Sequence, residues 1–310
     1  PPPPAAPLIA VPFTTYPGVE SGPTFSPDGS QVAFVWSGEK PPDTAGIYVK
    51  RIGPGPPLRI TTGPGFGPAW SPDGQFIAFL RPLANRKLGV FLIPPLGGPE
   101  RQVGEIRPDP GAASLTPGNL TWSADCKGLV VAEVANPSEP QALLVLSVET
   151  GEKKRLTTPP PLLRGDASPA LSPDGRRLAF NRFAARGVGQ LYVLDLSADL
   201  RPQGEPVRLH PESSSRPAWT PDGREIVFAS RGGLWRIAAS GAGKPQALGA
   251  VGQDGSQPAI ARAGPPRLVY VRQSTDQNIW RLDLSQPGAQ ASPFAASTRR
   301  EWTPQFSPDG

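Results

Sequence analysis

The sequence predicts an all-β fold, a β-propeller of four-stranded antiparallel blades, and three observations support this prediction. A seven-residue phrase, most often ending in Ser-Pro-Asp-Gly, recurs along the chain. Most copies are followed by short apolar segments, which are separated by residues that favour turns. The copies begin about 41 to 52 residues apart, which is close to the length of one four-stranded propeller blade.

The phrase combines the end of a first strand with a tight turn. It occurs as "PTFSPDG" (23–29), "PAWSPDG" (68–74), "LTWSADC" (120–126), "PALSPDG" (169–175), "PAWTPDG" (217–223), "PAIARAG" (258–264) and "PQFSPDG" (304–310). Proline fixes φ in such a turn, aspartate accepts bonds from nearby N–H groups, and glycine takes a positive φ at little cost. We therefore interpret these turn residues as structural: Asp28, Gly29, Asp73, Gly74, Asp125, Asp174, Gly175, Asp222, Gly223 and Asp309.

Three further strands are expected in each complete unit. The second strands are "QVAFVW", "FIAFL", "LVVAE", "RLAFN", "EIVFAS" and "RLVYV", and the third are "GIYVKRI", "GVFLIP", "ALLVLSV", "QLYVLDL", "GLWRIA" and "NIWRLDL". Fourth strands are expected at "PLRITT", "RQVGE", "KRLTT", "VRLH" and "PQALG". The apolar runs are nearly continuous rather than alternating, which indicates sheets covered on both faces. Propeller blades meet this condition because each blade lies between two others.

The two ends of the sequence resemble parts of a blade. Residues 7–15, "PLIAVPFTT", match the fourth strand "PLRITT", and residues 302–310 match a first strand with its turn. We expect six complete blades plus a partial seventh made from both termini. Residues 1–6 are interpreted as a Pro-rich linker, and residues 7–310 as one propeller domain from a longer protein, truncated at its C-terminus.

Two copies of the phrase depart from the rule. Cys126 replaces the turn glycine of the third unit, so either a non-glycine residue takes a positive φ there or a looser turn uses Gly128. The sixth unit keeps Gly264 but has lost Ser, Pro and Asp, and a different turn geometry is expected.

Composition limits the classes of partner. The net charge is +5, but no block of like charges occurs, so this domain is not expected to bind nucleic acid. The single cysteine cannot form an internal disulfide. No apolar run is long enough to span a bilayer, although an anchor upstream of residue 1 is compatible with the sequence.

With its Ser-Pro-Asp-Gly repeats, the chain resembles the TolB-type, WD40-like propeller family over almost its whole length. Stretches such as "YPGVESGPTFSPDGSQVAFVW" and "WTPDGREIVFASRGGLWRI" are similar to the propellers of bacterial membrane-anchored winged-helix transcriptional regulators and eukaryotic-like Ser/Thr kinases. The resemblance implies a cytoplasmic effector domain, a membrane helix and a propeller outside the membrane. It therefore implies an extracytoplasmic, periplasmic and membrane-tethered location.

Catalytic and cofactor motifs are not recognisable in the sequence. There is no G-x-S-x-G nucleophile motif, "GAGKP" (241–245) lacks most of a phosphate loop, and His210 is the only histidine. We expect no catalytic residue, cofactor or metal site in this chain. The repeated turn aspartates could form a ring of metal ligands, but turn capping is the favoured interpretation.

The axial channel and its mouth are the expected binding region, because the first strands line it and the residues before each phrase vary between units. These candidates are Glu20, Phe66, Asp166, Arg216, Asp254, Glu301 and Trp302. The expected ligand is a protein, a peptide or a small molecule.

Two classes of function remain open. The favoured one is a non-catalytic sensor or protein-interaction domain of a membrane-anchored signalling protein. The alternative is the regulatory propeller of a prolyl-oligopeptidase-like or tricorn-like hydrolase, and a TolB-like translocation role is a weaker third.

Overall fold

The computed structural model describes residues 9–41, 44–109, 120–273, 279–281, 290 and 292–295. The chain divides into two compact units, residues 1–271 and 272–310. In the second unit, β23 (Ile279–Arg281) pairs antiparallel with β24 (Ser292–Ala295). All other strands belong to the first unit, apart from the last residue of β22, and the description below concerns that unit.

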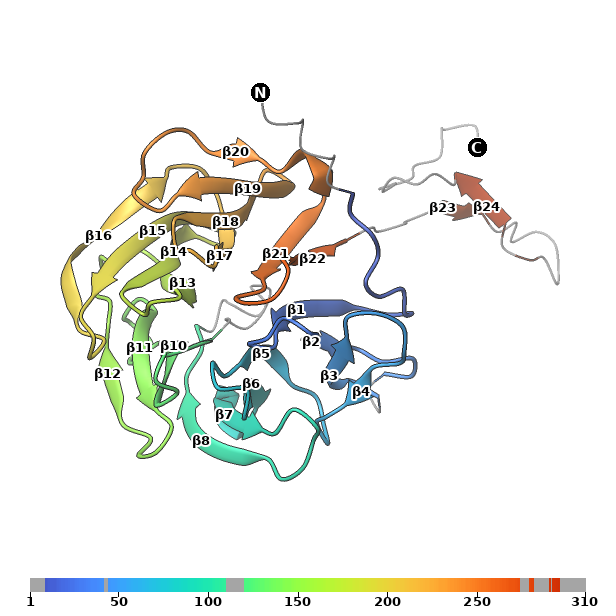
Figure 1. Cartoon of the computed structure of the whole chain (residues 1–310), viewed down its shortest axis with the longest axis horizontal. Coiled ribbons are helices and arrows are strands. Elements are labelled where there is room, and N and C mark those ends of the chain that lie inside the picture. The colour runs from blue at the N-terminus through green and yellow to red at the C-terminus, as the bar shows by residue number, and fades with distance from the viewer. Residues whose placement is uncertain are drawn as a thin grey trace. The chain divides into compact units, whose positions relative to one another are not determined.

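The first unit contains five complete four-stranded antiparallel blades arranged around a central axis (Figure 1). Blade one has β1 (Glu20–Phe25), β2 (Gln31–Trp36), β3 (Gly46–Arg51) and β4 (Leu58–Arg59). Blade two has β5 (Phe66–Trp70), β6 (Ile77–Pro82), β7 (Leu88–Ile93) and β8 (Arg101–Ile106). Blade three has β9 (Thr121–Trp122), β10 (Gly128–Glu133), β11 (Ala142–Ser147) and β12 (Lys153–Arg155).

The other two complete blades follow the same order, each strand pairing with the next along the chain. Blade four has β13 (Gly165–Leu171), β14 (Arg177–Ala185), β15 (Val188–Leu196) and β16 (Pro202–His210). Blade five has β17 (Ser215–Trp219), β18 (Glu225–Ser230), β19 (Gly233–Ala238) and β20 (Gln246–Ala247). The helical segments among the described residues are two short 3₁₀ turns, η1 (Ala84–Arg86) and η3 (Gly249–Val251).

The prediction of six complete blades plus a partial seventh is wrong. After blade five, the unit holds a two-stranded ladder of β21 (Gly255–Ile260) and β22 (Leu268–Arg272). This ladder packs directly against blade one, so no further blade lies between the two. Gly22 N–H donates to Gln257 Oε1 at 2.7 Å, and Arg267 Nη1 donates to the Gly29 carbonyl at 3.0 Å. The ring therefore closes between β21 and β1.

The prediction of a fourth strand over residues 7–15 is also not met, because residues 9–19 contain no strand. This segment instead packs on blade one. Phe13 contacts the cluster between the ladder and blade one, and Tyr16 lies against Trp36 with ring centroids 4.9 Å apart. Trp36 Nε1 also donates to the Pro17 carbonyl at 2.8 Å. Residues 302–310, the other predicted part of a seventh blade, lie outside the described residues.

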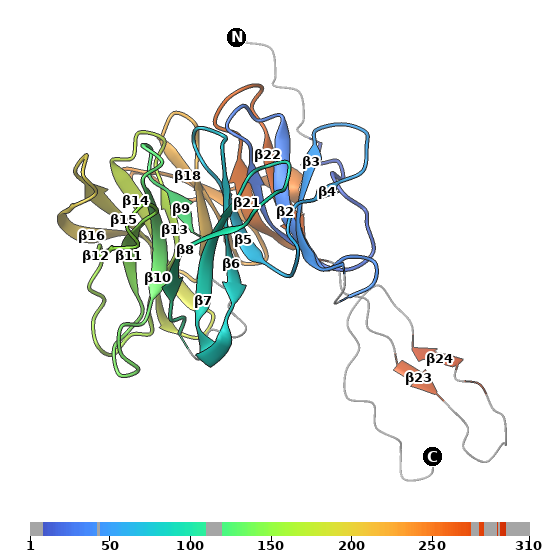
Figure 2. The ribbon, with the colours of Figure 1, turned by 90° about the horizontal axis from the view of Figure 1, so that it is seen from below.

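Apolar residues fill the spaces between successive blades, and the edge-on view in Figure 2 shows the blades standing side by side. Five clusters lie between successive elements from blade one to the β21–β22 ladder, and a sixth, with Phe25, Val32 and Ala261, joins the ladder to blade one. The central residues of the second strands, such as Phe79, Phe180 and Phe228, are fully buried. This burial on both faces explains why the strand sequences do not alternate.

Five of the recurring turns share one hydrogen-bond pattern. In the first, Ser26 Oγ donates to Asp28 Oδ1 at 2.5 Å, while Ser30 N–H donates to the same oxygen at 3.0 Å and Gln31 N–H donates to Ser26 Oγ at 2.9 Å. The equivalent hydroxyl-to-carboxylate bonds are Ser71–Asp73, Ser123–Asp125, Ser172–Asp174 and Thr220–Asp222. The turn carboxylates thus bind their own turns.

The two irregular turns differ from each other. Cys126 has φ +60° and its N–H bonds to the Ser123 carbonyl at 3.1 Å, so the alternative with a positive φ is confirmed and the looser turn is wrong. The sixth turn is one residue longer than the first. In the sixth unit, Ala261 N–H donates to the carbonyl of Arg267, six residues later in the chain, whereas in the first unit Ser26 N–H donates to the carbonyl of Gln31, five residues later. The expected change in geometry is therefore confirmed.

A buried ion pair joins the first two strands of blade four. Asp166 on β13 has no solvent exposure, and its carboxylate accepts two hydrogen bonds from Arg182 on β14, at 2.8 and 3.0 Å. The Arg182 guanidinium also lies over the rings of Phe180 and Tyr192. Burial raises the pKa of Asp166, and the hydrogen bonds and charge of Arg182 oppose that rise. Such a pair contributes little net stability when intact but leaves an uncompensated charge when one partner is removed.

The Asp166–Arg182 pair gives a prediction for stability. Asp166→Asn and Arg182→Met should each lower the free energy of unfolding by about 3–5 kcal/mol, and the double variant should lose less than the sum. Urea denaturation of the four proteins measures the coupling. Asp254→Asn is the matched control, because Asp254 is exposed with φ +71° and asparagine tolerates that conformation. Additive single effects would show that the two side chains do not act as a pair.

The first turn gives a prediction for pH. Hydrogen bonds from Ser26 and Ser30 lower the pKa of Asp28 to about 2, from the ordinary value of 3.8. A lowered carboxyl pKa stabilises the fold above pH 3.8, and this contribution is lost as the pH falls from 3.8 through about 2.

NMR titration of the Asp28 carboxyl measures this directly. Ser26→Ala should raise its pKa toward the ordinary value, because it removes the strongest hydrogen bond, and Ser30→Ala should raise it less. An unshifted pKa in the unsubstituted chain would show that the turn network does not form.

Candidate functional site

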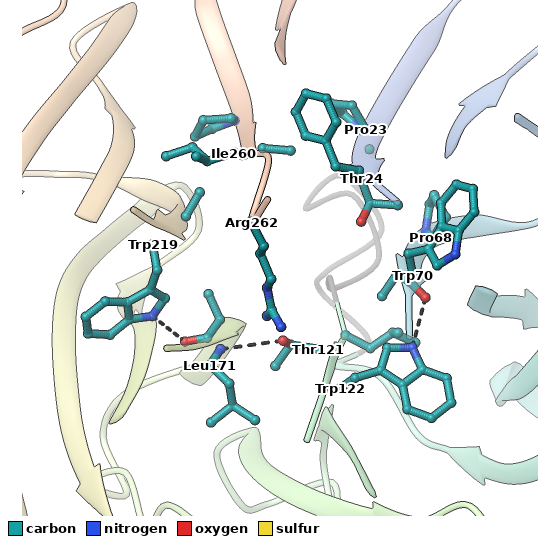
Figure 3. A pocket seen from close by; sticks show the side chains of 18 of the residues that line it. Pro23, Thr24, Pro68, Trp70, Thr121, Trp122, Leu171, Trp219, Ile260 and Arg262 are labelled. Atoms are coloured by element: carbon teal, nitrogen blue, oxygen red, sulfur yellow. Dashed lines mark hydrogen bonds between the residues drawn. The ribbon is translucent and has the colours of Figure 1, made fainter. Parts of the chain in front are cut away.

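A cavity of about 300 Å³ lies on the axis of the ring, between the innermost strands. Residues from β1, β5, β9, β13, β17 and β21 all line it (Figure 3). The cavity therefore gathers segments that are far apart in the sequence, as a binding site on a propeller axis requires.

Most of the inner strands carry the same local distortion where they reach the cavity. The residue before the strand proline has a positive φ in five of them, and β1, β5, β13 and β17 show a register shift at this point. These residues are Gly22, Gly67, Ser168, Arg216 and Gln257. Such a bulge bends the strand and redirects its side chains. Glycine takes this conformation freely, whereas the conformation strains Ser168, Arg216 and Gln257. Backbone strain of this kind is often found at functional sites.

Tryptophans at the ends of two inner strands tie the cavity wall together. Trp122 Nε1 donates to the Ala69 carbonyl of blade two at 2.9 Å, and Trp219 Nε1 donates to the Ala170 carbonyl of blade four at 2.8 Å (Figure 3). Each bond joins one blade to the blade before it. The wall is thus rigid and partly aromatic.

Among the described residues of this lining, the charged ones are two arginines, Arg216 and Arg262, and none is aspartate or glutamate. Burial lowers the pKa of Arg216 to about 10 and also lowers the pKa of Arg262. Arg262 is exposed to solvent, but the protein atoms around its guanidinium reduce its hydration, which lowers its pKa. The cavity is therefore electropositive.

The structure places the predicted binding residues in different environments. Arg216 lines the cavity. Asp166 is held in the buried ion pair, and Asp254 is exposed immediately before β21. Phe66 packs partly against the core between blades two and three. Glu20 accepts a hydrogen bond from Thr14 Oγ1 at 2.6 Å, and burial raises its pKa.

Glu301 and Trp302 lie outside the described residues. Their assignment to a binding site stays a prediction, as does that of the other candidates.

Sequence reasoning missed Arg262. In the sixth copy of the phrase, this residue stands where Pro27, Pro72 and Pro173 stand in other copies, and those prolines also line the cavity. The signal was present in the sequence as the loss of the Ser-Pro-Asp pattern. We interpreted that loss only as a change of turn geometry, although it also brings a charge to the axis.

Other candidate groups do not form a second site in the part of the chain that the structure describes. His210 is buried, its ring lies tilted against that of Phe228, and burial lowers its pKa. Burial likewise raises the pKa of the Cys126 thiol. Within the described ranges, no group of three or more His, Cys, Asp or Glu side chains could hold a metal ion.

No family model and no curated protein match this chain. Solved structures do. TolB from Acinetobacter baumannii is 19% identical, with a TM-score of 0.60, over 78% of this chain and 57% of that chain. A putative TolB from Agrobacterium tumefaciens is 20% identical, with a TM-score of 0.63, over 83% of this chain and 91% of that chain.

Propellers of proteases are similar as well. The β-propeller domain of the Trilobed protease from Pyrococcus furiosus is 14% identical, with a TM-score of 0.50, over 90% of this chain and 85% of that chain. A prolyl endopeptidase is 16% identical, with a TM-score of 0.52, over 89% of this chain and 41% of that chain. Among the described residues, no helix is long and apolar enough to cross a membrane. The comparisons show that this chain has the fold of a TolB-like β-propeller.

Proposed function

We propose that this chain is a non-catalytic sensor or protein-interaction domain of a bacterial membrane-anchored signalling protein, either a winged-helix regulator or a Ser/Thr kinase. The propeller would lie outside the cytoplasmic membrane and bind a protein, a peptide or a small molecule at its axial channel. Ligand binding outside would then bias the state of an effector inside.

The axial cavity is the observation that carries this proposal. It is bounded by inner strands with a repeated backbone but different side chains, such as glycine, serine, arginine and glutamine at the bulge positions. A rigid frame with variable side chains is suited to recognition. The similarity of some sequence stretches to regulator and kinase propellers supports the choice of a signalling protein.

The regulatory propeller of a hydrolase is the second candidate. The fold similarity to a prolyl endopeptidase covers most of this chain but less than half of that enzyme, as expected if a catalytic domain lies elsewhere in the protein. A TolB-like translocation role has only fold similarity in its favour.

The full open reading frame distinguishes these candidates. We expect a winged-helix or kinase domain, followed by a membrane helix, upstream of residue 1. A G-x-S-x-G motif followed by Asp and His downstream of residue 310 would contradict the proposal and favour the hydrolase.

The proposed location gives a further prediction. Alkaline phosphatase fused to the C-terminal end of the propeller in the full-length protein should be active, because that enzyme needs the disulfides that form outside the cytoplasm. The control is the same phosphatase fused to the N-terminal end of the full-length protein, which should be inactive. An inactive propeller fusion, with the fusion protein intact on a blot, would place the propeller in the cytoplasm.

A further inference from the structure

We propose that the axial cavity binds an oxyanion, a carboxylate or phosphoryl group, through Arg262 and Arg216. The group would belong to a small organic molecule or to the end of a chain that enters the channel. This inference rests on the proposed function in one respect, namely that the channel is where the ligand binds.

Arg262 extends into the middle of the cavity. Its backbone belongs to the irregular turn after β21, and Figure 3 shows its side chain crossing the cavity toward Thr121 on the far wall. Within the described residues, no protein group accepts a hydrogen bond from its guanidinium. The residues 110–119 that precede β9 contain no Asp or Glu. The five N–H donors of this group can therefore serve a ligand, and a planar guanidinium suits the two oxygens of a carboxylate or phosphate.

Arg216 supplies a second positive charge to the same cavity. It is the bulge residue of β17, with φ +52°, a conformation that is unfavourable for a side chain of this size. Its N–H is fixed by Asn181 Oδ1 at 3.0 Å, and Asn181 Nδ2 in turn donates to the Ser214 carbonyl at 3.1 Å. The neighbouring blade thus holds the backbone of Arg216 in the strained conformation that places the residue at the cavity.

The electrostatics of the cavity favour an anion over a cation or a neutral ligand. Burial lowers the pKa of both arginines, and the described residues that line the cavity include no aspartate or glutamate. An entering anion would accept charge-assisted hydrogen bonds from the Arg262 guanidinium and would be attracted by the positive charge of Arg216. A cavity of about 300 Å³ is at the small end of the range for ligand pockets, which limits the bound part to a small anionic group with a short attached segment.

The test titrates the purified chain with two probes, succinate and inorganic phosphate, at constant ionic strength. Succinamide is the uncharged match to succinate. Binding is followed by calorimetry and by tryptophan fluorescence, since Trp70, Trp122 and Trp219 line the cavity. Succinate or phosphate should bind with a stoichiometry of one, and the better probe identifies the chemical group. Succinamide should not bind.

Variants assign the binding to the cavity. Arg262→Gln and Arg216→Gln should each weaken binding about tenfold or more, because each removes a charged hydrogen-bond donor. Arg224→Gln is the control, because Arg224 is an exposed arginine on a turn outside the cavity, and it should bind like the unsubstituted chain. Arg262→Lys keeps the positive charge but lacks the planar guanidinium, so this variant should bind the anion less tightly than the unsubstituted chain. It serves as the test of Arg262 if Arg262→Gln does not fold.

Several outcomes would overturn the inference. These are no binding of either anion, equal binding of succinamide, or unchanged affinity in the folded Arg262 variants. None of these binding results depends on the domain order of the full-length protein, and that domain order tests the proposed function separately. Conversely, a hydrolase domain in the reading frame would leave a positive anion titration unaffected.

Discussion

Burial of both faces of every sheet is the constraint on which this structure depends. A blade made of "QVAFVW" or "FIAFL" strands cannot expose either face to water without losing much of its hydrophobic stabilisation. Each blade therefore needs two neighbours. The outer faces of the first and last blades are buried when the row of blades closes into a ring. In this chain closure occurs between β21 and β1, where Phe25, Val32 and Ala261 form the last apolar cluster. The N-terminal segment adds to it through Phe13, and needs no strand pairing to do so.

Closure also creates the candidate site. Six inner strands that meet at a common axis leave a cavity, and five of them carry a residue with a positive φ next to it. Because the backbone is fixed by inter-blade bonds such as those of Trp122 and Trp219, the residue at a bulge can vary without loss of the frame. Of the bulge residues, Gly22, Arg216 and Gln257 line the cavity. The shape of the cavity thus comes from the repeat, and its chemistry comes from the departures from the repeat.

The sequence alone predicted the local elements well and the global ones less well. The second strand of blade one was predicted at residues 31–36 and is found there, because apolar runs and Ser-Pro-Asp-Gly turns are local signals. The number of blades depends on where the ring closes, which no local pattern encodes. Residues 7–15 resemble "PLRITT", but the described part, residues 9–15, forms no strand. Asp166 was assigned to the channel mouth from its position before a phrase, but the direction of its side chain follows from pairing with Arg182 on the next strand.

Arg262 shows why a degraded repeat can be more informative than an intact one. In the intact turns, a hydroxyl and a carboxylate satisfy the backbone, and proline limits the loop. The sixth turn lacks the hydroxyl, the proline and the carboxylate. Instead, a hydrogen bond from Arg267 to the Gly29 carbonyl fixes this segment to the neighbouring blade. Local rules that are broken where a compensating contact exists commonly mark functional positions. Neutral drift would remove the Ser-Pro-Asp pattern equally well, but here the residue that replaces the proline is an arginine that lines the axial cavity. The combination of a lost turn motif, a compensating contact and a charge directed into the cavity is our reason for proposing Arg262 as a ligand-binding residue.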